Sequence, residues 1–277
     1  MNYNKLKVCI IGLGKMGHRY SEYLDEYGVD WTYYDPFVAG GLNKLEDLDK
    51  YSHIMISTPP ENHYDSYQKV IKLNPTSKIY LDKPVIIKDT DLNVLENKNV
   101  FCGMTERYNP TVIALKQLID IKELISIKFS RYSMVLDNIE TPVLFDLGIH
   151  DLDLYLYLLG FDKFPGTYDV FEKSKTCYII TKQHDILSIF EWSHESKRRE
   201  RKILVFQKNT VYEADLIDQT ILLYGSNQII KNLHINKGQP LGKIIKSFLD
   251  NECCDAKLSH AFMMKIMQNK WDREPSI

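Results

Sequence analysis

The sequence predicts an α/β protein of two domains, on three observations. Its 277 residues suit two modest domains or a single large one. The first hundred residues alternate between strand and helix patterns, which is typical of a parallel sheet with crossover helices. After about residue 160 the chain reads instead as strands separated by short polar turns. The pattern changes near 106–110, so we expect domains of 1–108 and 109–277.

The composition is that of an ordinary globular protein, with 44% hydrophobic and 26% charged residues. A net charge of −2 provides no basic field, so we expect neither nucleic acid nor a membrane as partner. No apolar stretch reaches the roughly 18 residues of a membrane span, and no secretory signal pattern is present. The five cysteines show no paired spacing, so we expect reduced thiols, no metal site and a cytoplasmic protein.

The first domain is predicted to begin with a buried strand at 7–12, a β-branched apolar run that ends in glycine. Helical spacing follows at 15–27. Further strands are expected at 30–34, 53–57, 78–81 and 100–103, with helices at 63–73 and 91–97.

The second domain is predicted to contain a helix at 111–119, a strand at 124–133 and a helix at 147–159. A series of strands follows, at 167–173, 175–182, 186–193, 201–206, 210–215 and 219–224. Helices at 240–250 and 257–269 end the chain. The short polar turns between the strands predict an antiparallel meander.

Gly12, Gly14 and Gly17 form a GxGxxG turn between the first strand and the first helix. The first glycine permits a tight turn, the second lets the backbone approach a pyrophosphate, and the third allows close helix–strand packing. The helix N-terminus, with Lys15 and Met16, then faces the anion. A glycine triplet alone is weak evidence, but its position after a strand and before a helix matches a Rossmann dinucleotide-binding domain.

Asp35 ends the second strand, about 20 residues after the turn, where such domains carry an acidic residue. Its carboxylate would accept hydrogen bonds from ribose hydroxyls and repel a 2′-phosphate, so we expect NAD rather than NADP. The alternative is a glycine turn that binds nothing, with Asp35 as a turn residue before Pro36.

The carboxyl ends of the strands line the ligand crevice in this fold. The third strand runs into Ser57, Thr58 and Pro59, and His63 follows. His63 could contact the cofactor or simply begin the next helix, and both interpretations stay open. Lys83 lies at the same edge and could donate a proton to a carbonyl or alkoxide oxygen, or it is a solvated lysine after a strand.

Asp146, His150, Asp153 and Tyr157 have the spacing i, i+4, i+7 and i+11, which places them on one face of the predicted helix. On a face that borders a cleft, His150 could move a proton while a carboxylate orients it. The alternative is a solvated helix face with Asp146 as its N-cap.

Together these motifs resemble the Gfo/Idh/MocA oxidoreductases, which act on sugars, cyclitols and nucleotide sugars. The order and rough spacing agree over nearly the whole chain. The matching segments are GLGKMG (12–17), Asp35, STPPENH (57–63), LDKP (81–84), ERYNP (106–110), DLGIHDLD (146–153) and QPLGKIIKSFLDN (239–251).

The resemblance implies a Rossmann domain followed by an α/β domain with an open, mainly antiparallel sheet. Such a sheet often forms a subunit interface, so we expect a homodimer or homotetramer. It also implies an NAD(P)-dependent dehydrogenase or reductase that acts on CH–OH groups of a sugar-like small molecule. The residues that it assigns to catalysis are Lys83, Asp146 and His150, with Thr58, Pro59 and Asp82 on the nicotinamide ribose side, and Arg107 and Tyr108 beside the substrate.

The chain departs from the family pattern at Asp82, where the family has glutamate, and at 141–145, where a glycine pair is usual. The second domain is also short for the family. The stretch from Trp192 to Tyr224 is loosely similar to the branch that contains UDP-sugar 3-dehydrogenases. Three other functions stay open: a non-catalytic dinucleotide-binding regulator, a different Rossmann reductase of the bilin or amino-acid type, and an NAD-dependent glycoside hydrolase.

Overall fold

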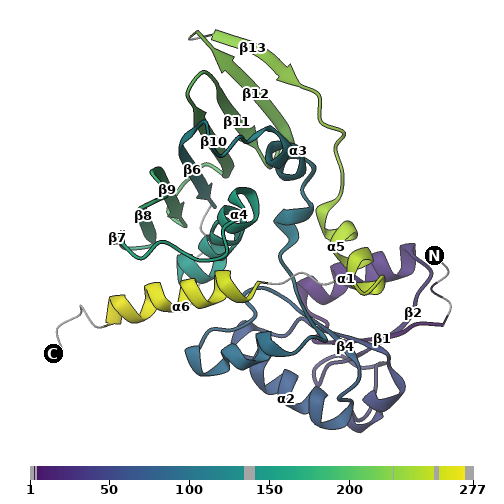
Figure 1. The fold of residues 1–277 in the computed structure, drawn as a ribbon. Helices are drawn as coiled ribbons and strands as arrows, with labels where there is room; N and C mark the ends of the chain where they lie inside the picture. The colour runs from purple at the N-terminus through teal and green to yellow at the C-terminus, as the bar shows by residue number, and fades with distance from the viewer. Residues whose placement is uncertain (1–2, 4, 134–140, 227, 253–255, 272–277) are drawn as a thin grey trace. The chain divides into compact units, whose positions relative to one another are not determined.

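The computed structural model describes residues 3, 5–133, 141–226, 228–252 and 256–271, and Figure 1 shows its elements. The chain forms two compact units: unit 1 comprises Met1–Met104 and Leu241–His260, and unit 2 comprises Thr105–Pro240 and Ala261–Ile277. Cys9, Cys102 and Cys177 are buried and form no disulfide, whereas Cys253 and Cys254 lie outside the described residues. Within the described ranges, no helix combines the length and the apolar character needed to cross a bilayer.

Unit 1 is built on a five-stranded parallel sheet with the order β2-β1-β3-β4-β5. Its strands are β1 (Lys7–Ile11), β2 (Asp30–Tyr34), β3 (His53–Ile56), β4 (Lys78–Leu81) and β5 (Val100–Cys102). Its helices are α1 (Lys15–Glu26), α2 (His63–Leu73) and the 3₁₀ helices η1 (Leu45–Lys50), η2 (Pro60–Asn62) and η3 (Asp89–Glu96). The expected parallel sheet is confirmed, and the helix expected at 91–97 is the 3₁₀ helix η3.

The strand order explains where a ligand can enter unit 1. The chain moves from β1 to β2 in one direction across the sheet and from β3 to β4 in the other. Right-handed crossovers therefore place α1 and α2 on opposite faces, as Figure 1 shows. The carboxyl ends of β1 and β3 lie at the point where the order reverses, and ligands of such sheets bind in the crevice there.

The late segment of the chain belongs to unit 1 because of the packing of helix α5 (Pro240–Leu249). The ring of Phe248 lies 5.1 Å from that of His53, 5.5 Å from Tyr80 and 5.3 Å from Phe101, measured between centroids. All four side chains are buried, so α5 completes the core on one face of the parallel sheet. The following helix, α6 (Lys257–Trp271), begins in unit 1 and continues in unit 2.

Burial of His53 predicts a loss of stability in acid. Burial lowers the pKa of His53 from 6.5 to about 4, and the positive charge of Lys78 acts in the same direction. The unfolded chain therefore binds a proton that the folded chain excludes between pH 6.5 and about 4. We expect this group to lower the free energy of unfolding by about 2–3 kcal/mol between pH 7 and pH 4.5, and His53→Gln to remove that part.

Urea denaturation of both proteins at the two pH values measures this difference. Because carboxylates titrate equally in both proteins, only the difference between wild type and variant reports on His53. An identical pH dependence in the two would contradict the prediction.

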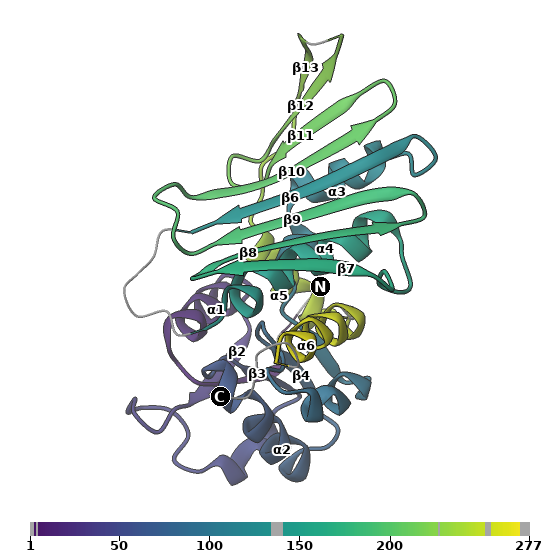
Figure 2. The same ribbon diagram turned by 90° about the vertical axis from the view of Figure 1, so that its left-hand side faces the viewer.

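Unit 2 is built on an eight-stranded sheet with the order β13-β12-β11-β10-β6-β9-β8-β7 (Figure 2). Its strands are β6 (Leu124–Tyr132), β7 (Tyr168–Lys173), β8 (Thr176–Gln183), β9 (Ile186–Ser193), β10 (Glu200–Gln207), β11 (Val211–Asp215), β12 (Thr220–Gly225) and β13 (Gln228–Leu233). Its helices before α6 are η4 (Thr105–Tyr108), α3 (Pro110–Leu118), the π-helical turn η5 (Leu144–Gly148) and α4 (Ile149–Leu159).

The mainly antiparallel sheet is confirmed, but the expectation of a simple meander is wrong at its centre. Strand β6 lies between β9 and β10 and runs parallel to β9. Ile127 and Phe129 of β6 are fully buried, which suits a central strand that packs beneath helices. Strand β13 was not expected, because its residues are almost all exposed and give no core-facing alternation.

Helices cover one face of this sheet, with α3 and α4 behind the strands in Figure 2. Side chains of each strand alternate between the two faces, as in β8, where Ile179 is buried and Ile180 is 38% exposed. Within the part of the chain that the structure describes, no helix of unit 2 covers the opposite face. We call this face the open face of the sheet.

Candidate functional site

The glycine turn joins β1 to α1 through contacts that exclude a side chain. Gly12 has a φ of +89°, and a Cβ there would lie 2.9 Å from the Thr58 backbone nitrogen. A Cβ on Gly17 would lie 2.3 Å from the Gly12 carbonyl oxygen. The hydroxyl of Ser57, at the end of β3, donates to that same carbonyl over 2.7 Å. These contacts hold the end of β1 close to the end of β3 and to the start of α1, as the sequence predicts.

Asp35 is tied to the glycine turn. Its Oδ2 accepts a hydrogen bond from the Leu13 backbone N–H over 2.8 Å, and its Oδ1 accepts one from the Phe37 N–H over 2.8 Å. Each carboxylate oxygen can accept further bonds. The carboxylate therefore lies beside the turn, where a ribose would follow a pyrophosphate bound at the helix N-terminus.

Three observations in unit 1 fit a bound dinucleotide. Helix α1 begins after Gly14 with no side-chain cap, so its first backbone N–H groups can meet an anion. A Cβ on Gly14 would meet no described atom within 4 Å, so the backbone there can be approached closely. Thr58 Oγ1 is buried without a hydrogen-bond partner among the described residues. Of the other predicted contacts, Lys15 is exposed and Met16 half-buried in the first turn of α1.

His63 begins helix α2, and its buried ring spans two strand ends. Its Nδ1 lies 2.9 Å from the Pro84 carbonyl oxygen and its Nε2 lies 2.8 Å from that of Thr58. The ring thereby holds together the segments that follow β3 and β4. A direct cofactor contact by His63 stays a prediction, and the geometry favours a supporting role.

The segment after β4 carries Asp82 and Lys83. Burial raises the pKa of the Asp82 carboxyl above its ordinary value, although the charges of Lys83 and His63 oppose the shift. Its Oδ1 accepts the Lys83 backbone N–H over 2.8 Å. Asp82 thus fixes the backbone at the residue that carries the predicted catalytic lysine.

His260, which the sequence did not indicate as a site residue, supports the same segment. This fully buried histidine of α6 accepts the Val85 backbone N–H at Nε2 over 3.0 Å, and its Nδ1 donates to the Ala256 carbonyl over 2.8 Å. The contact joins residues far apart in sequence. The sequence provides little signal for this role, because His260 lies among both polar and apolar residues of the predicted helix.

In unit 2 the predicted helix that carries Asp146 and His150, here called the Asp–His helix, begins with a π-turn. Asp146 belongs to η5 and His150 to the first turn of α4, so Asp146 is not the N-cap of a regular helix. Asp146, His150 and Tyr157 are half-buried, whereas Asp153 is buried. The four side chains predicted on one helix face are therefore divided: three are partly accessible, and the fourth belongs to a buried ion pair.

Arg107 makes that ion pair. Its Nε and Nη2 donate to the two carboxylate oxygens of Asp153 over 2.7 and 2.6 Å. Its guanidinium also lies 5.5 Å from the ring centroid of Tyr157. These contacts attach η4 to α4. Substrate contacts by Arg107 and the neighbouring Tyr108 stay predictions.

A second residue that the sequence did not indicate is His194, directly after β9. Its Nε2 lies 3.1 Å from Asp146 Oδ2, and its ring is fully buried while the Asp146 side chain is 31% exposed. Asp146 is thus fixed from the protein interior and still reaches the surface of unit 2.

A buried ionic network lies beneath α4, with Arg131 of β6 at its centre. Arg131 donates to Asp151 Oδ1 through Nε and Nη2 over 3.0 and 2.8 Å, and to Glu106 over 2.9 Å. Trp192 donates to Asp151 and Arg201 to Glu106, both over 2.9 Å. Although burial opposes ionisation of Glu106, Arg131 and Arg201 hold its pKa below the ordinary value.

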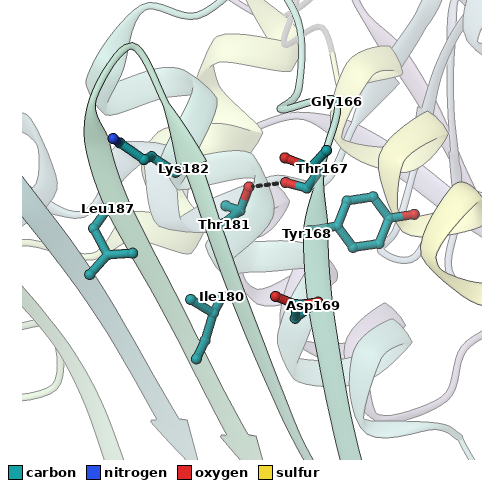
Figure 3. Close-up of a pocket in the computed structure, with 8 residues that line it drawn as sticks. All are labelled: Gly166, Thr167, Tyr168, Asp169, Ile180, Thr181, Lys182 and Leu187. Atoms are coloured by element: carbon teal, nitrogen blue, oxygen red, sulfur yellow. Dashed lines mark hydrogen bonds between the residues drawn. The ribbon is translucent and has the colours of Figure 1, made fainter.

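A hollow of about 490 Å³ lies on strands β7–β9 of unit 2 (Figure 3). It is lined by Gly166, Thr167, Tyr168, Asp169, Ile180, Thr181, Lys182 and Leu187. None of the predicted catalytic or cofactor-binding residues belongs to this lining. No group of three or more histidine, cysteine or acidic side chains among the described residues could hold a metal ion.

Comparison with solved structures decides the fold. UDP-N-acetylglucosamine 3-dehydrogenase GnnA from Acidithiobacillus ferrooxidans superposes with a TM-score of 0.82 at 15% identity, covering 95% of this chain and 96% of that one. The dehydrogenase MviM from Clostridium difficile gives 0.74 at 15% identity, covering 96% and 100%. An NAD binding oxidoreductase from Klebsiella pneumoniae gives 0.73 at 13% identity, covering 97% of both.

The chain has the two-domain fold of these oxidoreductases. This confirms the fold that the resemblance to the Gfo/Idh/MocA oxidoreductases implied. No family model and no curated protein matches the sequence. At these identities the likeness is one of fold, so the roles of individual residues rest on the geometry of each unit.

Proposed function

We propose that the protein is an NAD(P)-dependent oxidoreductase that transfers hydride between nicotinamide and a secondary alcohol or ketone of a sugar, cyclitol or nucleotide sugar. The observation that carries the proposal is the cradle made by Gly12, Gly17 and the uncapped start of α1, with Asp35 bonded to it. A dinucleotide is the ligand that such a cradle and carboxylate suit.

When bound, the nicotinamide ring would accept or return the hydride, which is chemistry that no protein side chain supplies. The glycine turn would hold the pyrophosphate and Asp35 the adenosine ribose. Thr58, Pro59 and Asp82 would face the nicotinamide ribose, where the buried hydroxyl of Thr58 could donate a hydrogen bond.

In alcohol oxidation, His150 would take the hydroxyl proton as the hydride leaves the same carbon. Asp146 would orient the reacting group or the imidazole, and Lys83 would bind the oxygen as it becomes a carbonyl. Ketone reduction uses the same groups in reverse, since His150 then returns the proton.

NAD is favoured over NADP by the surroundings of Asp35. A 2′-phosphate would meet this carboxylate, and residues 36–43 (PFVAGGLN) provide no lysine or arginine to neutralise it. We therefore propose NAD as the cofactor.

A nucleotide sugar is the first substrate to test. The neighbour with the TM-score of 0.82 is named a UDP-N-acetylglucosamine 3-dehydrogenase. This chain carries Lys197, Arg198 and Arg199 in the exposed loop between β9 and β10, where they could meet a diphosphate. Arg198 also pairs with Glu200 over 2.9 Å.

A screen of free sugars, inositols and UDP-sugars with NAD and with NADP tests the proposal through the absorbance of the reduced cofactor. We expect reduction of NAD with at least one substrate. Tight NAD binding without turnover on any of them would instead indicate a non-catalytic regulator. Sugar release without net NADH would indicate glycoside hydrolysis.

We further propose that the protein is a homodimer or homotetramer through the open face of the sheet. Apolar side chains exposed there include Phe171, Tyr178, Ile180, Leu187 and Phe206. Burying such a patch against a second copy removes apolar area from water. We expect the double variant Ile180→Lys/Leu187→Lys to sediment as a monomer, and Ile113→Lys on α3 to sediment as wild type does. A wild-type monomer at micromolar concentration would contradict this proposal.

A further inference from the structure

Two side chains near the end of β9 each hold a carboxylate of the Asp–His helix. Trp192 and His194 are two residues apart, so they project from the same face of the strand. The His194 backbone N–H donates to the Lys175 carbonyl, which extends the strand geometry to His194. Trp192 Nε1 donates to Asp151, and His194 Nε2 to Asp146.

The π-turn allows Asp146 and Asp151 to contact β9 at the same time. Asp146 and Asp151 are five residues apart, which in a regular α-helix would turn them about 140° from one another. The extra residue in the π-turn η5 reduces that angle, so both carboxylates can face β9. Gly148 lies between them, and a Cβ there would come within 3.1 Å of the Trp192 ring. The turn therefore packs directly on β9.

The hydrogen bond also determines the tautomer of His194. To donate to a carboxylate, Nε2 must carry a proton. Nδ1 is buried and has no hydrogen-bond partner among the described residues. With the proton on Nε2, the buried Nδ1 is a lone pair and not an N–H without an acceptor.

We propose that His194 is a positioning residue, which fixes the carboxylate of Asp146 in the orientation that the reaction with His150 requires. This inference rests on the proposed function. The His194 ring is fully buried, so it acts through Asp146 and not on the substrate. Misorientation of a reacting group by about 1 Å can cost 10²-fold in rate, so loss of the donor should lower kcat by about 10–100-fold.

The experiment compares His194→Phe, which keeps the ring volume and removes the donor, with His194→Gln, whose amide nitrogen lies near the place of Nε2. Both are measured for kcat, for KM of the alcohol and for NAD affinity by titration. We expect His194→Phe to lose kcat with NAD affinity unchanged, and His194→Gln to recover most of it. His234→Phe, at an exposed histidine of the same unit, is the matched control and should retain wild-type kcat. A kcat of His194→Phe within twofold of wild type overturns the proposal.

Should His194→Phe fail to fold, His194→Asn replaces it, because its amide lies near the place of Nδ1 and does not reach Asp146. Equal kcat for the Asn and Gln variants then overturns the proposal. A readout without turnover is ¹⁵N NMR of the histidine rings at neutral pH, with His194 assigned by its absence in His194→Gln. A proton on Nε2 that becomes exchange-broadened in Asp146→Ala supports the contact, and an Nε2 without a proton overturns it. If the wild type turns over no substrate, the proposed function is contradicted. The NMR experiment still decides whether His194 donates to Asp146.

Discussion

Replacing His150 with asparagine is expected to lower turnover by about 10²–10⁴-fold while NAD binding stays at the wild-type level. Asparagine keeps a polar side chain of similar length but cannot exchange a proton near neutral pH. His150 lies in the first turn of α4 and forms no part of the glycine cradle, so we expect the proposed pyrophosphate and ribose contacts to be unaffected. Lys83→Ala is expected to have the same pair of effects, because Lys83 follows β4 and forms no part of the glycine cradle.

Steady-state kinetics with the best substrate of the screen and NAD titration by intrinsic fluorescence measure these effects. The control is His184→Asn, an exposed histidine of unit 2 with a φ of +49°, a conformation that asparagine tolerates. It should retain wild-type turnover. Wild-type rates in both His150→Asn and Lys83→Ala would contradict the assignment of these residues to catalysis. Retained activity after loss of His150 would favour a different Rossmann reductase.

Replacing Arg131 with methionine is expected to lower the free energy of unfolding by about 3–5 kcal/mol. Methionine matches much of the volume of the side chain, so the loss reports on the charge. Without Arg131, Asp151 keeps the Trp192 N–H as a donor but no cation, and Glu106 keeps Arg201. Both carboxylates stay buried, and an uncompensated buried charge is strongly destabilising.

Urea denaturation at neutral pH measures the effect of Arg131→Met. Arg198→Met removes an arginine whose side chain is 70% exposed and paired with Glu200, and it should change stability by at most about 1 kcal/mol. A loss for Arg131→Met no larger than that of the control would show that the network does not hold α4 on the sheet.

The sequence by itself determined the architecture of unit 1. Gly12, Gly17 and Asp35 form a local pattern, because a turn between a strand and a helix depends on residues that are close in the chain. The strands of unit 1 were predictable for a related reason, since buried parallel strands are short continuous apolar runs. Asp146 and His150 could be placed on one helical segment by their spacing alone.

Only the tertiary structure decided which groups those side chains meet. His194 lies 48 residues from Asp146, and Arg131 lies 20 from Asp151. The π-turn at Asp146, the insertion of β6 beside β9 and the return of α5 to the parallel sheet likewise depend on packing between distant segments. Periodicity reports which face of an element is buried. It carries no information about the partner across that face, because the partner is chosen by shape, charge and chain topology.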